Sequence, residues 1–409
     1  MKYVIIGNSA GAIGCVEGIR SIDKEGEITL ISNEPHHTYS RPLISYLIYG
    51  KTYEKRMKYR PDSFYTDNNV TAMLGKTVTA IDNKAKTVML DDGIKVEYDK
   101  LLVATGSSPF VPPMTGLEKV EKKFTFMTLD DAKALEEELS KDKNVLVVGA
   151  GLIGLKCVEG ICDKVNKITV VDLADRILPS ILDEEGSSMV QKHIEKSGVE
   201  FILGDSVAEF TSDTATLKSG KSLSFDIVVL AVGVRPNVSL IKDIGGKVNR
   251  GIATNDKCET SINDIYSAGD CTESYDITTD SDKVLALLPN AYMQGECAGI
   301  NMAGGEKLYD KAIPMNAIGF FGMHIITAGT YTGDVYTDKN ENSYKKLFTK
   351  DNRLMGYIVI GKVERAGIYT SLIREKTPLD TIDFELIKEK PQLMAFSMKE
   401  RSHKLSGAK

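Results

Sequence analysis

The sequence predicts an α/β protein with two similar halves and a smaller α+β part at the C-terminal end. Two observations support this fold class. Short apolar runs alternate with helical patterns, which is typical of parallel sheets with crossover helices. The chain also repeats its own pattern, because an apolar run entering a tight turn occurs at 4–12 and again at 146–154. A second apolar run, ending in Ala-x-Gly, occurs at 101–106 and again at 228–233. Together the repeats predict two dinucleotide-binding domains.

The composition is that of an ordinary globular protein. The 409 residues are 42% hydrophobic and 26% charged, enough chain for two or three domains. No stretch approaches 18 uninterrupted apolar residues, so we expect no membrane span. The first apolar run follows Lys2 directly, so we expect no signal peptide and a cytoplasmic protein. The net charge of -6 argues against nucleic-acid binding.

The six cysteines and five histidines have no spacing typical of a metal site. No C-x-x-C pair occurs, which argues against an iron–sulfur cluster, a zinc site and a redox dithiol. We therefore expect no metal, and thiols that are mostly buried in a reducing compartment.

Changes in composition divide the chain into segments. Prolines cluster between 107 and 128, and a helix is expected at 129–141 with Thr128 as its N-cap. After Pro314 the pattern becomes alternating with glycine turns. The expected parts are a first dinucleotide-binding domain at 1–112 and 245–315, a second at 113–244, a C-terminal α+β domain at 316–390, and a frayed polar tail at 391–409.

The second glycine turn carries the sharpest signal. Gly149-x-Gly151-x-x-Gly154 follows an apolar strand and opens a helix. The first glycine permits the turn, the second lets the backbone approach a pyrophosphate, and the third lets helix and strand pack. After the next strand, at 168–171, comes Asp172, whose carboxylate can accept ribose hydroxyls and would repel a 2′-phosphate. This pattern predicts a Rossmann-like site that prefers NADH.

The first turn is a less regular copy of this motif. It reads Gly7-x-Ser9-x-x-Ala12, with small residues where the second and third glycines would stand. Glu34 follows the strand at 28–31, in the position of the ribose-binding acid.

With these motifs the chain resembles the FAD-dependent pyridine nucleotide-disulfide oxidoreductases. The similar branch includes NADH:rubredoxin reductases, ferredoxin reductases, the flavin half of nitrite reductases and NADH oxidases. The resemblance spans roughly 1–380. It rests on the segments Gly7-Asn8-Ser9, Tyr39-Ser40-Arg41-Pro42-Leu43, Ala104-Thr105-Gly106-Ser107, Gly149-Ala150-Gly151-Leu152-Ile153-Gly154, Gly233-Val234-Arg235-Pro236-Asn237 and Tyr266-Ser267-Ala268-Gly269-Asp270.

The resemblance implies a glutathione reductase-like fold with FAD and NADH as cofactors. It assigns Asp270 to the ribityl chain of FAD and Arg41 to the vicinity of its pyrophosphate. Thr105 and Gly106 would line the FAD, and Gly233 would approach the nicotinamide nucleotide. The cofactor-binding residues expected from motif and resemblance are Gly7, Ser9, Ala10, Ala12, Glu34, Arg41, Pro42, Thr105, Gly106, Gly149, Gly151, Ile153, Gly154, Asp172, Gly233, Gly269 and Asp270.

The chain departs from the family in two places. The stretch 39–47 has no cysteine where the dithiol and single-cysteine branches carry their reactive sulfur. Disulfide reduction and sulfenate chemistry are therefore not expected. Lys156 stands where relatives place a glutamate facing the nicotinamide, and Tyr46 lies near the position of a flavin-side lysine. We expect Lys156 and Tyr46 to be catalytic. Alternatively, Lys156 faces solvent or pairs with Glu159 at i+3.

The segment from Lys51 to Arg60 holds five basic residues and one acid. It is either a solvated face or a docking patch for an acidic electron carrier. The leading functional reading is an NADH-dependent reductase of a rubredoxin- or ferredoxin-type protein, acting alone or as the flavin subunit of a larger complex. The alternatives are an NADH oxidase that reduces oxygen, and a flavin-bound interaction protein switched by reduction. The oligomeric state is left open.

Overall fold

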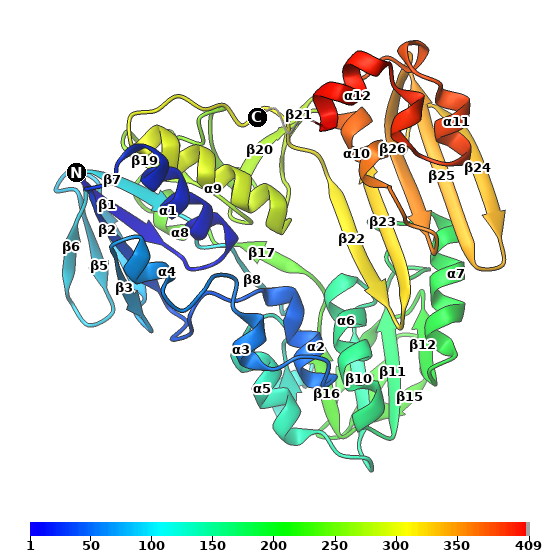
Figure 1. Ribbon diagram of the computed structural model, residues 1–409. Helices are drawn as coiled ribbons and strands as arrows, with labels where there is room; N and C mark the ends of the chain where they lie inside the picture. The colour runs from blue at the N-terminus through cyan, green and yellow to red at the C-terminus, as the bar shows by residue number, and fades with distance from the viewer. Residues whose placement is uncertain (406–409) are drawn as a thin grey trace. The chain divides into compact units, whose positions relative to one another are not determined.

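The computed structural model describes residues 1–405 and divides into two compact units (Figure 1). The first unit comprises 1–180, 187–274 and 282–310. The second comprises 181–186, 275–281 and the chain from 311 onward.

The first sheet of the first unit is parallel throughout, with strand order β19-β7-β1-β2-β3. Helix α1 (Ala10–Ile22) connects β1 to β2, as the apolar periodicity predicts. Four short helices lie between β2 and β3: η1 (Arg41–Leu43), α2 (Ile44–Ile48), α3 (Glu54–Met57) and α4 (Phe64–Asp67). The strands are β1 (Lys2–Ile6), β2 (Glu27–Ser32), β3 (Val70–Leu74), β7 (Lys100–Val103) and β19 (Ile265–Ser267).

The second sheet repeats this arrangement with the order β12-β11-β10-β16-β9. Helix α5 (Leu129–Glu138) precedes it, and the Thr128 side chain caps that helix in a reciprocal capping box with Asp131. The helix ends three residues before the expected end at 141. Helices α6 (Leu152–Ile161), η3 (Cys162–Lys164) and α7 (Glu184–Glu195) connect the strands β9 (Lys123–Phe124), β10 (Asn144–Val148), β11 (Lys167–Asp172), β12 (Val199–Leu203) and β16 (Ile227–Leu230).

One crossover in each half is a three-stranded antiparallel meander and not a helix, the usual crossover of a parallel sheet. Between β3 and β7 it consists of β4 (Val78–Asp82), β5 (Thr87–Leu90) and β6 (Lys95–Glu97). Between β12 and β16 it consists of β13 (Val207–Phe210), β14 (Thr214–Leu217) and β15 (Ser222–Ser224). These meanders are too short for the period of a helix to be distinguished from that of a strand.

A two-stranded antiparallel ribbon joins the halves. β8 (Ser107–Pro109) follows β7, and β17 (Val234–Pro236) follows β16, so the two Ala-x-Gly turns of the repeat pair their outgoing strands. The remaining elements between 117 and 302 are η2 (Leu117–Lys119), α8 (Ser239–Lys242), α9 (Leu288–Met302) and the small sheet of β18 (Ile252–Ala253), β20 (Thr272–Asp276) and β21 (Ser281–Val284).

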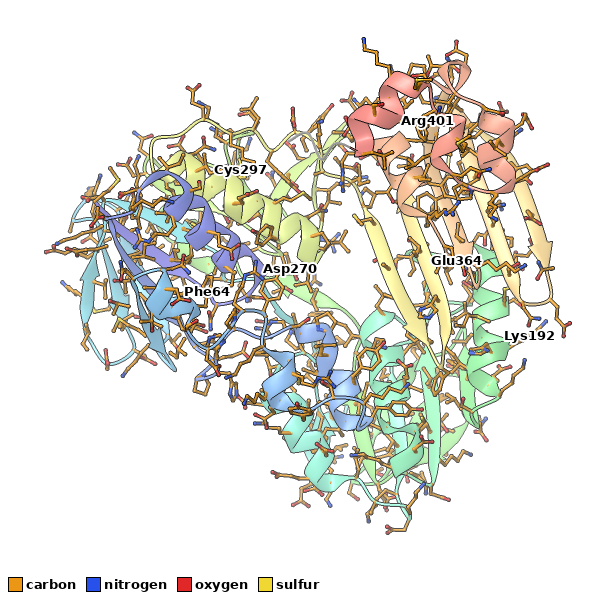
Figure 2. All side chains as sticks on the ribbon, in the orientation of Figure 1. Phe64, Lys192, Asp270, Cys297, Glu364 and Arg401 are labelled. Carbon is orange, nitrogen blue, oxygen red and sulfur yellow. The ribbon has the colours of Figure 1, made fainter. Side chains whose placement is uncertain are left out.

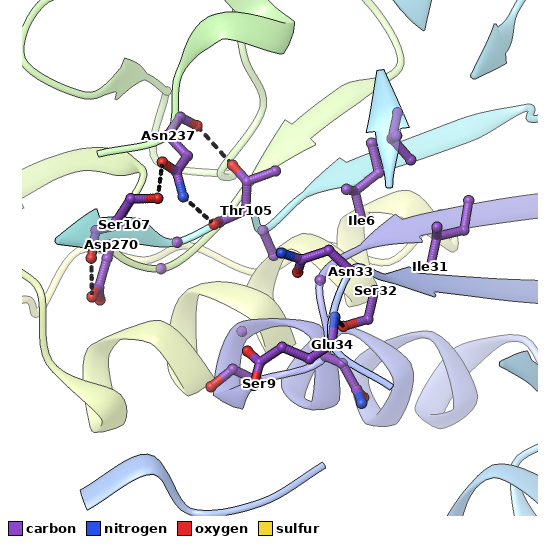
Figure 3. A pocket seen from close by; sticks show the side chains of 18 of the residues that line it. Ile6, Ser9, Ile31, Ser32, Asn33, Glu34, Thr105, Ser107, Asn237 and Asp270 are labelled. Carbon is purple, nitrogen blue, oxygen red and sulfur yellow. Dashed lines mark hydrogen bonds between the residues drawn. The ribbon is translucent and has the colours of Figure 1, made fainter. Parts of the chain in front are cut away.

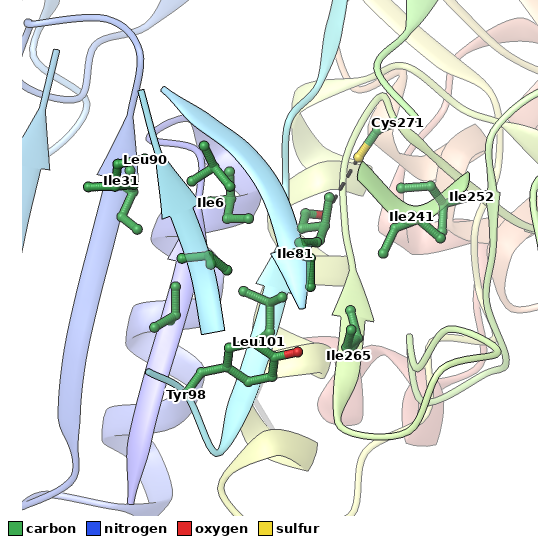
Figure 4. Packing of buried hydrophobic residues seen from close by; sticks show 14 residues of the cluster. Ile6, Ile31, Ile81, Leu90, Tyr98, Leu101, Ile241, Ile252, Ile265 and Cys271 are labelled. Atoms are coloured by element: carbon green, nitrogen blue, oxygen red, sulfur yellow. Dashed lines mark hydrogen bonds between the residues drawn. The ribbon is translucent and has the colours of Figure 1, made fainter. Parts of the chain in front are cut away.

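The first sheet and its meander share one apolar core (Figure 4). Ile6, Leu101 and Ile265 come from parallel strands, while Ile81 and Leu90 come from the meander, and all are at most 7% exposed. The meander therefore covers one face of the sheet, the role that a crossover helix usually has.

Helices α1 and α9 lie side by side and touch through their backbones (Figure 1). A Cβ atom added at Gly14 would come within 3.0 Å of the backbone at Tyr292, and one at Gly18 would do the same at Glu296. Gly299 similarly faces the Cys15 carbonyl. Cys297, labelled in Figure 2, lies on α9 with Gly299. The absence of side chains at these positions is what permits the close approach.

The second unit is an antiparallel sheet of order β22-β23-β26-β25-β24 with helices packed on it. Tyr357 and Tyr369 are fully buried between the sheet and α10. This confirms the expected α+β character. Its strands are β22 (Met315–Phe320), β23 (Met323–Gly329), β24 (Asp334–Asn340), β25 (Ser343–Lys350) and β26 (Arg353–Ile360), and its helices are α10 (Gly367–Arg374), η4 (Leu379–Thr381), α11 (Phe384–Glu389), η5 (Leu393–Ala395) and α12 (Met398–Leu405).

The expected frayed tail is wrong for its first part. Ala395 and Phe396 are buried in the core of this unit, because η5 turns their side chains inward. Residues 406–409 lie outside the described residues. Within residues 1–405, none of the helices has the length and apolar character that crossing a membrane requires.

We predict that Gly299→Ala lowers the free energy of unfolding by about 3 kcal/mol, because the new methyl group would overlap the Cys15 backbone. Gly367→Ala is the matched control, since that helical glycine faces open space and has no positive φ. Urea unfolding followed by circular dichroism and tyrosine fluorescence measures both. An equal effect of the two substitutions would contradict the close helix contact.

Candidate cofactor-binding site

A cavity of about 370 Å³ lies at the carboxyl ends of β1 and β2, beside the first residues of α1 and α9 (Figure 3). Ligands of parallel α/β sheets bind at this end of the strands. The cavity brings together nine of the expected residues: Gly7, Ser9, Ala10, Glu34, Arg41, Thr105, Gly106, Gly269 and Asp270. Neither Ala12 nor Pro42 is among the residues that line the cavity. Ala12 is buried within α1, and Pro42 is the second residue of η1.

The glycine turn at the start of α1 shows why small residues are needed there. Gly7 has φ +124°, and a Cβ at this position would overlap the Ala104 carbonyl. Ser9 is the N-cap of α1, and the backbone of 9–11 faces the cavity. The unpaired N–H groups at a helix N-terminus attract phosphate. The geometry therefore fits the pyrophosphate of a dinucleotide such as FAD.

Asp270 enters the cavity from the turn after β19 (Figures 2 and 3). The Ser107 hydroxyl donates a hydrogen bond to its carboxylate at 3.1 Å. Burial raises the pKa of Asp270, and the Ser107 bond and the Arg41 charge only partly oppose this. A hydroxyl-bearing chain in the cavity would find an acceptor here.

Glu34 and Arg41 form a network that the sequence motifs did not indicate. The Arg41 guanidinium pairs with one Glu34 oxygen, and the Tyr39 hydroxyl donates to the other at 2.6 Å. Tyr39 also accepts the Leu129 N–H at 3.0 Å, and Arg41 donates to the Met127 carbonyl at 3.3 Å. This end of the cavity is thus joined to the second half of the chain. Tyr39 begins one of the segments on which the family resemblance rests, and this is the sequence signal that could have indicated its contacts with Glu34 and Leu129.

Asn237 is a second residue that sequence reasoning missed. Its side-chain amide donates to the Thr105 carbonyl at 2.9 Å, and the Thr105 hydroxyl donates to the Asn237 carbonyl at 2.7 Å (Figure 3). Its backbone N–H donates to the Gly106 carbonyl at 2.9 Å. These bonds hold the turn after β7 against the turn after β16.

The three glycines of the second motif differ in what a side chain at each position would meet. A Cβ at Gly149 would overlap the Ala231 carbonyl, and one at Gly154 would overlap the Gly149 carbonyl. A Cβ at Gly151 would meet no atom within 4 Å. Gly151 therefore faces open space. The same holds for Gly233, which lies in the turn after β16. This agrees with the expected use of the second glycine for close approach of a ligand. Ile153 lies half-buried in the first turn of α6.

Asp172 stands at the end of β11, where the motif predicts the ribose acid. One of its carboxylate oxygens accepts the Ala150 N–H at 2.6 Å, and the other accepts the Ala174 N–H at 2.7 Å. The carboxylate therefore also holds the glycine turn in place. Each oxygen retains a lone pair with which it can accept a ribose hydroxyl.

Lys156 and Tyr46 meet where α6 packs against α2. The Lys156 ammonium lies 4.4 Å from the centre of the Tyr46 ring and pairs with the Glu159 carboxylate. The Lys156 side chain is 18% exposed and that of Glu159 only 5%, so the solvent-facing alternative is wrong and the i+3 pair is present. Neither Lys156 nor Tyr46 is among the residues that line the cavity.

The basic segment 51–60 is partly neutralised by folding. Arg60 forms a two-point ion pair with Glu17 of α1, and Lys58 pairs with Asp62. Lys55 and Arg56 stay exposed on α3. Lys51, at the start of the segment, is exposed as well, so folding reduces the positive charge of this surface without removing it.

The cysteines are not among the residues that line the cavity, although Cys271 directly follows Asp270. Among residues 1–405, Cys162 is half-buried and the other five are buried. Burial raises the pKa of Cys162 to about 11, which makes it a poor nucleophile at neutral pH. The residues described as lining the cavity include no cysteine.

Comparison with known proteins supports the expected family. Residues 1–295 match the family model described as pyridine nucleotide-disulphide oxidoreductase, and 314–377 match the rubredoxin NAD+ reductase C-terminal domain. The chain is 31% identical to the epsilon subunit of an NADH-dependent phenylglyoxylate dehydrogenase from Aromatoleum evansii, over 92% of each chain. It is 30% identical to an NADH oxidase from Methanocaldococcus jannaschii, over 88% of each chain.

Further relatives differ in length and partners. An NADH-rubredoxin oxidoreductase from Clostridium acetobutylicum is 28% identical over 93% of this chain and 96% of its own. The chain spans about half the length of a Bacillus subtilis nitrite reductase, 48%, at 29% identity. Among solved structures, a covalent putidaredoxin reductase–putidaredoxin complex has a TM-score of 0.88 at 22% identity, over 99% of each chain.

These likenesses confirm the fold class of two dinucleotide-binding domains with a small C-terminal domain. The first family model alone covers more than half of the chain, and one relative exceeds 30% identity over nearly all of it. The protein therefore belongs to the pyridine nucleotide-disulphide oxidoreductase family, as an enzyme that uses FAD and NADH.

Proposed function

We propose that this enzyme takes electrons from NADH through FAD and passes them to an iron–sulfur protein of rubredoxin or ferredoxin type. The observation that carries the proposal is the match of 314–377 to the rubredoxin NAD+ reductase C-terminal domain, directly after the oxidoreductase match. The cavity supports it too, because the residues described there offer no thiol for the disulfide chemistry of other branches. When bound, FAD supplies the step from two-electron to one-electron transfer.

The residues have the following proposed roles. Gly7, Ser9 and Ala10 would admit and hold the FAD pyrophosphate at the N-terminus of α1, with Arg41 close by. Glu34 would accept the adenosine ribose, and Asp270 the ribityl hydroxyls. The remaining predicted cofactor residues keep the roles that motif and resemblance give them.

The domain limits follow from these roles. We assign FAD binding to 1–112 and 245–315, NADH binding to 113–244, and a C-terminal domain to 316–396, which extends past the expected limit of 390 because Ala395 and Phe396 lie in its core. The strand connections support the discontinuous first domain, since β19 completes the sheet begun by β1. The six free cysteines agree with a reducing, cytoplasmic location.

Two variants of this function have support. The relative from Aromatoleum evansii is named as a subunit and matches over 92% of each chain, which favours membership of a larger redox complex. The relative from Methanocaldococcus jannaschii is named an NADH oxidase, which favours direct reduction of oxygen.

We predict that the NADH-reduced enzyme is reoxidised at least about tenfold faster by rubredoxin or ferredoxin than by air-saturated buffer. Stopped-flow absorbance of the flavin measures this, with the enzyme first reduced by NADH under anaerobic conditions and then mixed with each acceptor in turn. Faster reoxidation by oxygen would favour the oxidase. A flavin that stays reduced with every acceptor would indicate a redox-switched interaction protein.

The same assay tests docking of an acidic carrier. Lys55→Glu/Arg56→Glu should slow protein reduction at low salt and leave ferricyanide reduction unchanged, because charge steering acts mainly on association. Lys84→Glu/Lys95→Glu, on the exposed meander of the first half, is the matched control. Equal rates for both variants would make the segment a solvated face.

We predict that NADH is preferred over NADPH about a hundredfold in kcat/KM, which corresponds to about 2.7 kcal/mol. The reason is that a 2′-phosphate would lie against the Asp172 carboxylate, and like charges in a confined site repel. Steady-state kinetics with ferricyanide as acceptor gives the ratio. A ratio near one would refute the placement of the ribose at Asp172.

We predict that Lys156→Met lowers the flavin midpoint potential by on the order of 30 mV, for about 1.4 kcal/mol of lost charge stabilisation in a two-electron couple. Hydride transfer should slow while FAD content stays the same. Lys156→Arg keeps the charge and should behave as wild type. Lys156→Met/Glu159→Gln removes both charges of the ion pair and so separates the effect of charge from an effect on stability. An unchanged potential in both Met variants would make Lys156 purely structural.

A further inference from the structure

Within the first compact unit, the segment between β2 and η1 is bonded to the start of α5. The Tyr39 hydroxyl accepts the Leu129 N–H at 3.0 Å. A ring nitrogen of His36 lies 2.7 Å from a carboxylate oxygen of Asp130. His36 and Tyr39 also line the cofactor cavity. The same short segment therefore forms a wall of the cavity and holds the first residues of α5.

The hydrogen bonds of the Tyr39 hydroxyl can run in one direction only. A backbone N–H can only donate, so the hydroxyl oxygen accepts from Leu129 and its proton goes to Glu34, 2.6 Å away. Burial raises the pKa of Tyr39, the Arg41 charge opposes this in part, and the bond to Glu34 adds to it, so the hydroxyl keeps its proton at neutral pH. Leu129, Tyr39 and Glu34 thus form one line of hydrogen bonds that ends in the cavity (Figure 3).

Both ends of this line need the Tyr39 hydroxyl. Leu129 is the first residue of α5, and the N–H groups in the first turn of a helix have no partner within the helix. Leu129 is buried, so its N–H needs a partner from the protein. At the other end, Arg41 pairs with one oxygen of Glu34 and Tyr39 with the other. The two partners together fix the plane of the Glu34 carboxylate, and each oxygen keeps a lone pair for a further donor.

α5 leads into the strand that carries the second glycine turn. A short loop after Glu138 connects α5 to β10, and β10 ends at Val148, directly before Gly149. α2, which carries Tyr46, packs against both α5 and α6. A shift of α5 would therefore be passed to the turn expected to hold NADH, and the packing of α2 would limit its size.

We propose that Tyr39 is a positioning residue that couples bound FAD to the NADH-binding part of the enzyme. The adenosine ribose of FAD would engage Glu34, Glu34 holds the Tyr39 hydroxyl, and Tyr39 holds the N-terminus of α5. Such a coupling is reciprocal, so α5 in turn stabilises the ribose site. The proposal rests on the proposed function, because it takes Glu34 as the ribose acid and 113–244 as the NADH-binding domain.

Tyr39→Phe keeps the ring and removes both bonds of the hydroxyl. We expect the Kd of the apoprotein for FAD to rise about five- to tenfold. Stopped-flow reduction of the flavin at saturating FAD and NADH should slow about three- to tenfold, while the Kd for NADH stays within about twofold, because the Asp172 turn is intact. A Tyr39 that only orients Glu34 would raise the Kd for FAD and leave the rate of reduction unchanged.

Leu129→Pro tests the α5 end without changing a residue of the cavity. Proline lacks the N–H, suits the first position of a helix, and tolerates the extended backbone of Thr128 (φ −109° is not required; here φ is −104° and ψ 167°). It should slow reduction as Tyr39→Phe does and weaken FAD binding. Leu129→Ala is the matched control, because it loses similar packing but keeps the N–H, and it should be reduced at least about threefold faster than Leu129→Pro.

The double variant Tyr39→Phe/Leu129→Pro separates coupling from stability. Tyr39→Phe leaves the buried Leu129 N–H without its acceptor, and this costs free energy of unfolding. The double variant removes the N–H as well, so its stability should recover while its reduction stays as slow as in either single variant. A rate that recovers together with the stability would overturn the proposal.

Tyr3→Phe is the control for the loss of a tyrosine hydroxyl bonded to a carboxylate. Tyr3 donates to Asp23 at 2.8 Å, and both residues are outside the set that lines the cavity, so the Kd for FAD and the rate should stay within about twofold of wild type. An unchanged Kd for FAD or an unchanged rate in Tyr39→Phe, or equal rates in Leu129→Pro and Leu129→Ala, would overturn the proposal. A wild-type protein that binds no FAD, or whose flavin NADH does not reduce, would instead overturn the proposed function.

Discussion

The backbone contact between α1 and α9 is the constraint on which the cofactor cavity depends. Glycines at the facing positions let the helices approach more closely than any side chain would allow. Their first turns therefore both reach the cavity, Ser9 from one helix and Ala291 from the other. The Gln294 side chain accepts the Gly269 N–H at 2.8 Å, so α9 also holds the turn that presents Asp270.

The sequence predicted the parts of the site that local backbone rules determine. A turn such as Gly149–Gly154 requires its glycines for steric reasons, and the length of β11 fixes where Asp172 stands. The pairing of Lys156 with Glu159 could be stated as an alternative because helical spacing brings i and i+3 together. The N-cap Thr128 was predicted from the preference of threonine for that position, whereas the end of its helix was placed three residues too late.

Contacts between distant segments could not be predicted in this way. The bond from Leu129 to Tyr39 joins residues 90 positions apart, and no pattern in either segment indicates the other. The neutralisation of Arg60 in the basic segment could not be predicted, because its partner Glu17 lies 43 positions away in the sequence. The glycines of α9 likewise could not be interpreted from the sequence, because the need for them arises from the close contact with the backbone of α1.

The α1–α9 contact also has a consequence for biosynthesis. α1 leaves the ribosome early, but α9 begins roughly 270 residues later, which takes about 13–54 s at ~5–20 residues per second. During this interval the glycine face of α1 is not yet covered by α9, and one edge of β7 is not yet paired with β19. The second half has all its strands by then and can close first. The first domain to be started is thus the last of the two to be completed, and its exposed surfaces are the ones that a chaperone would have to cover.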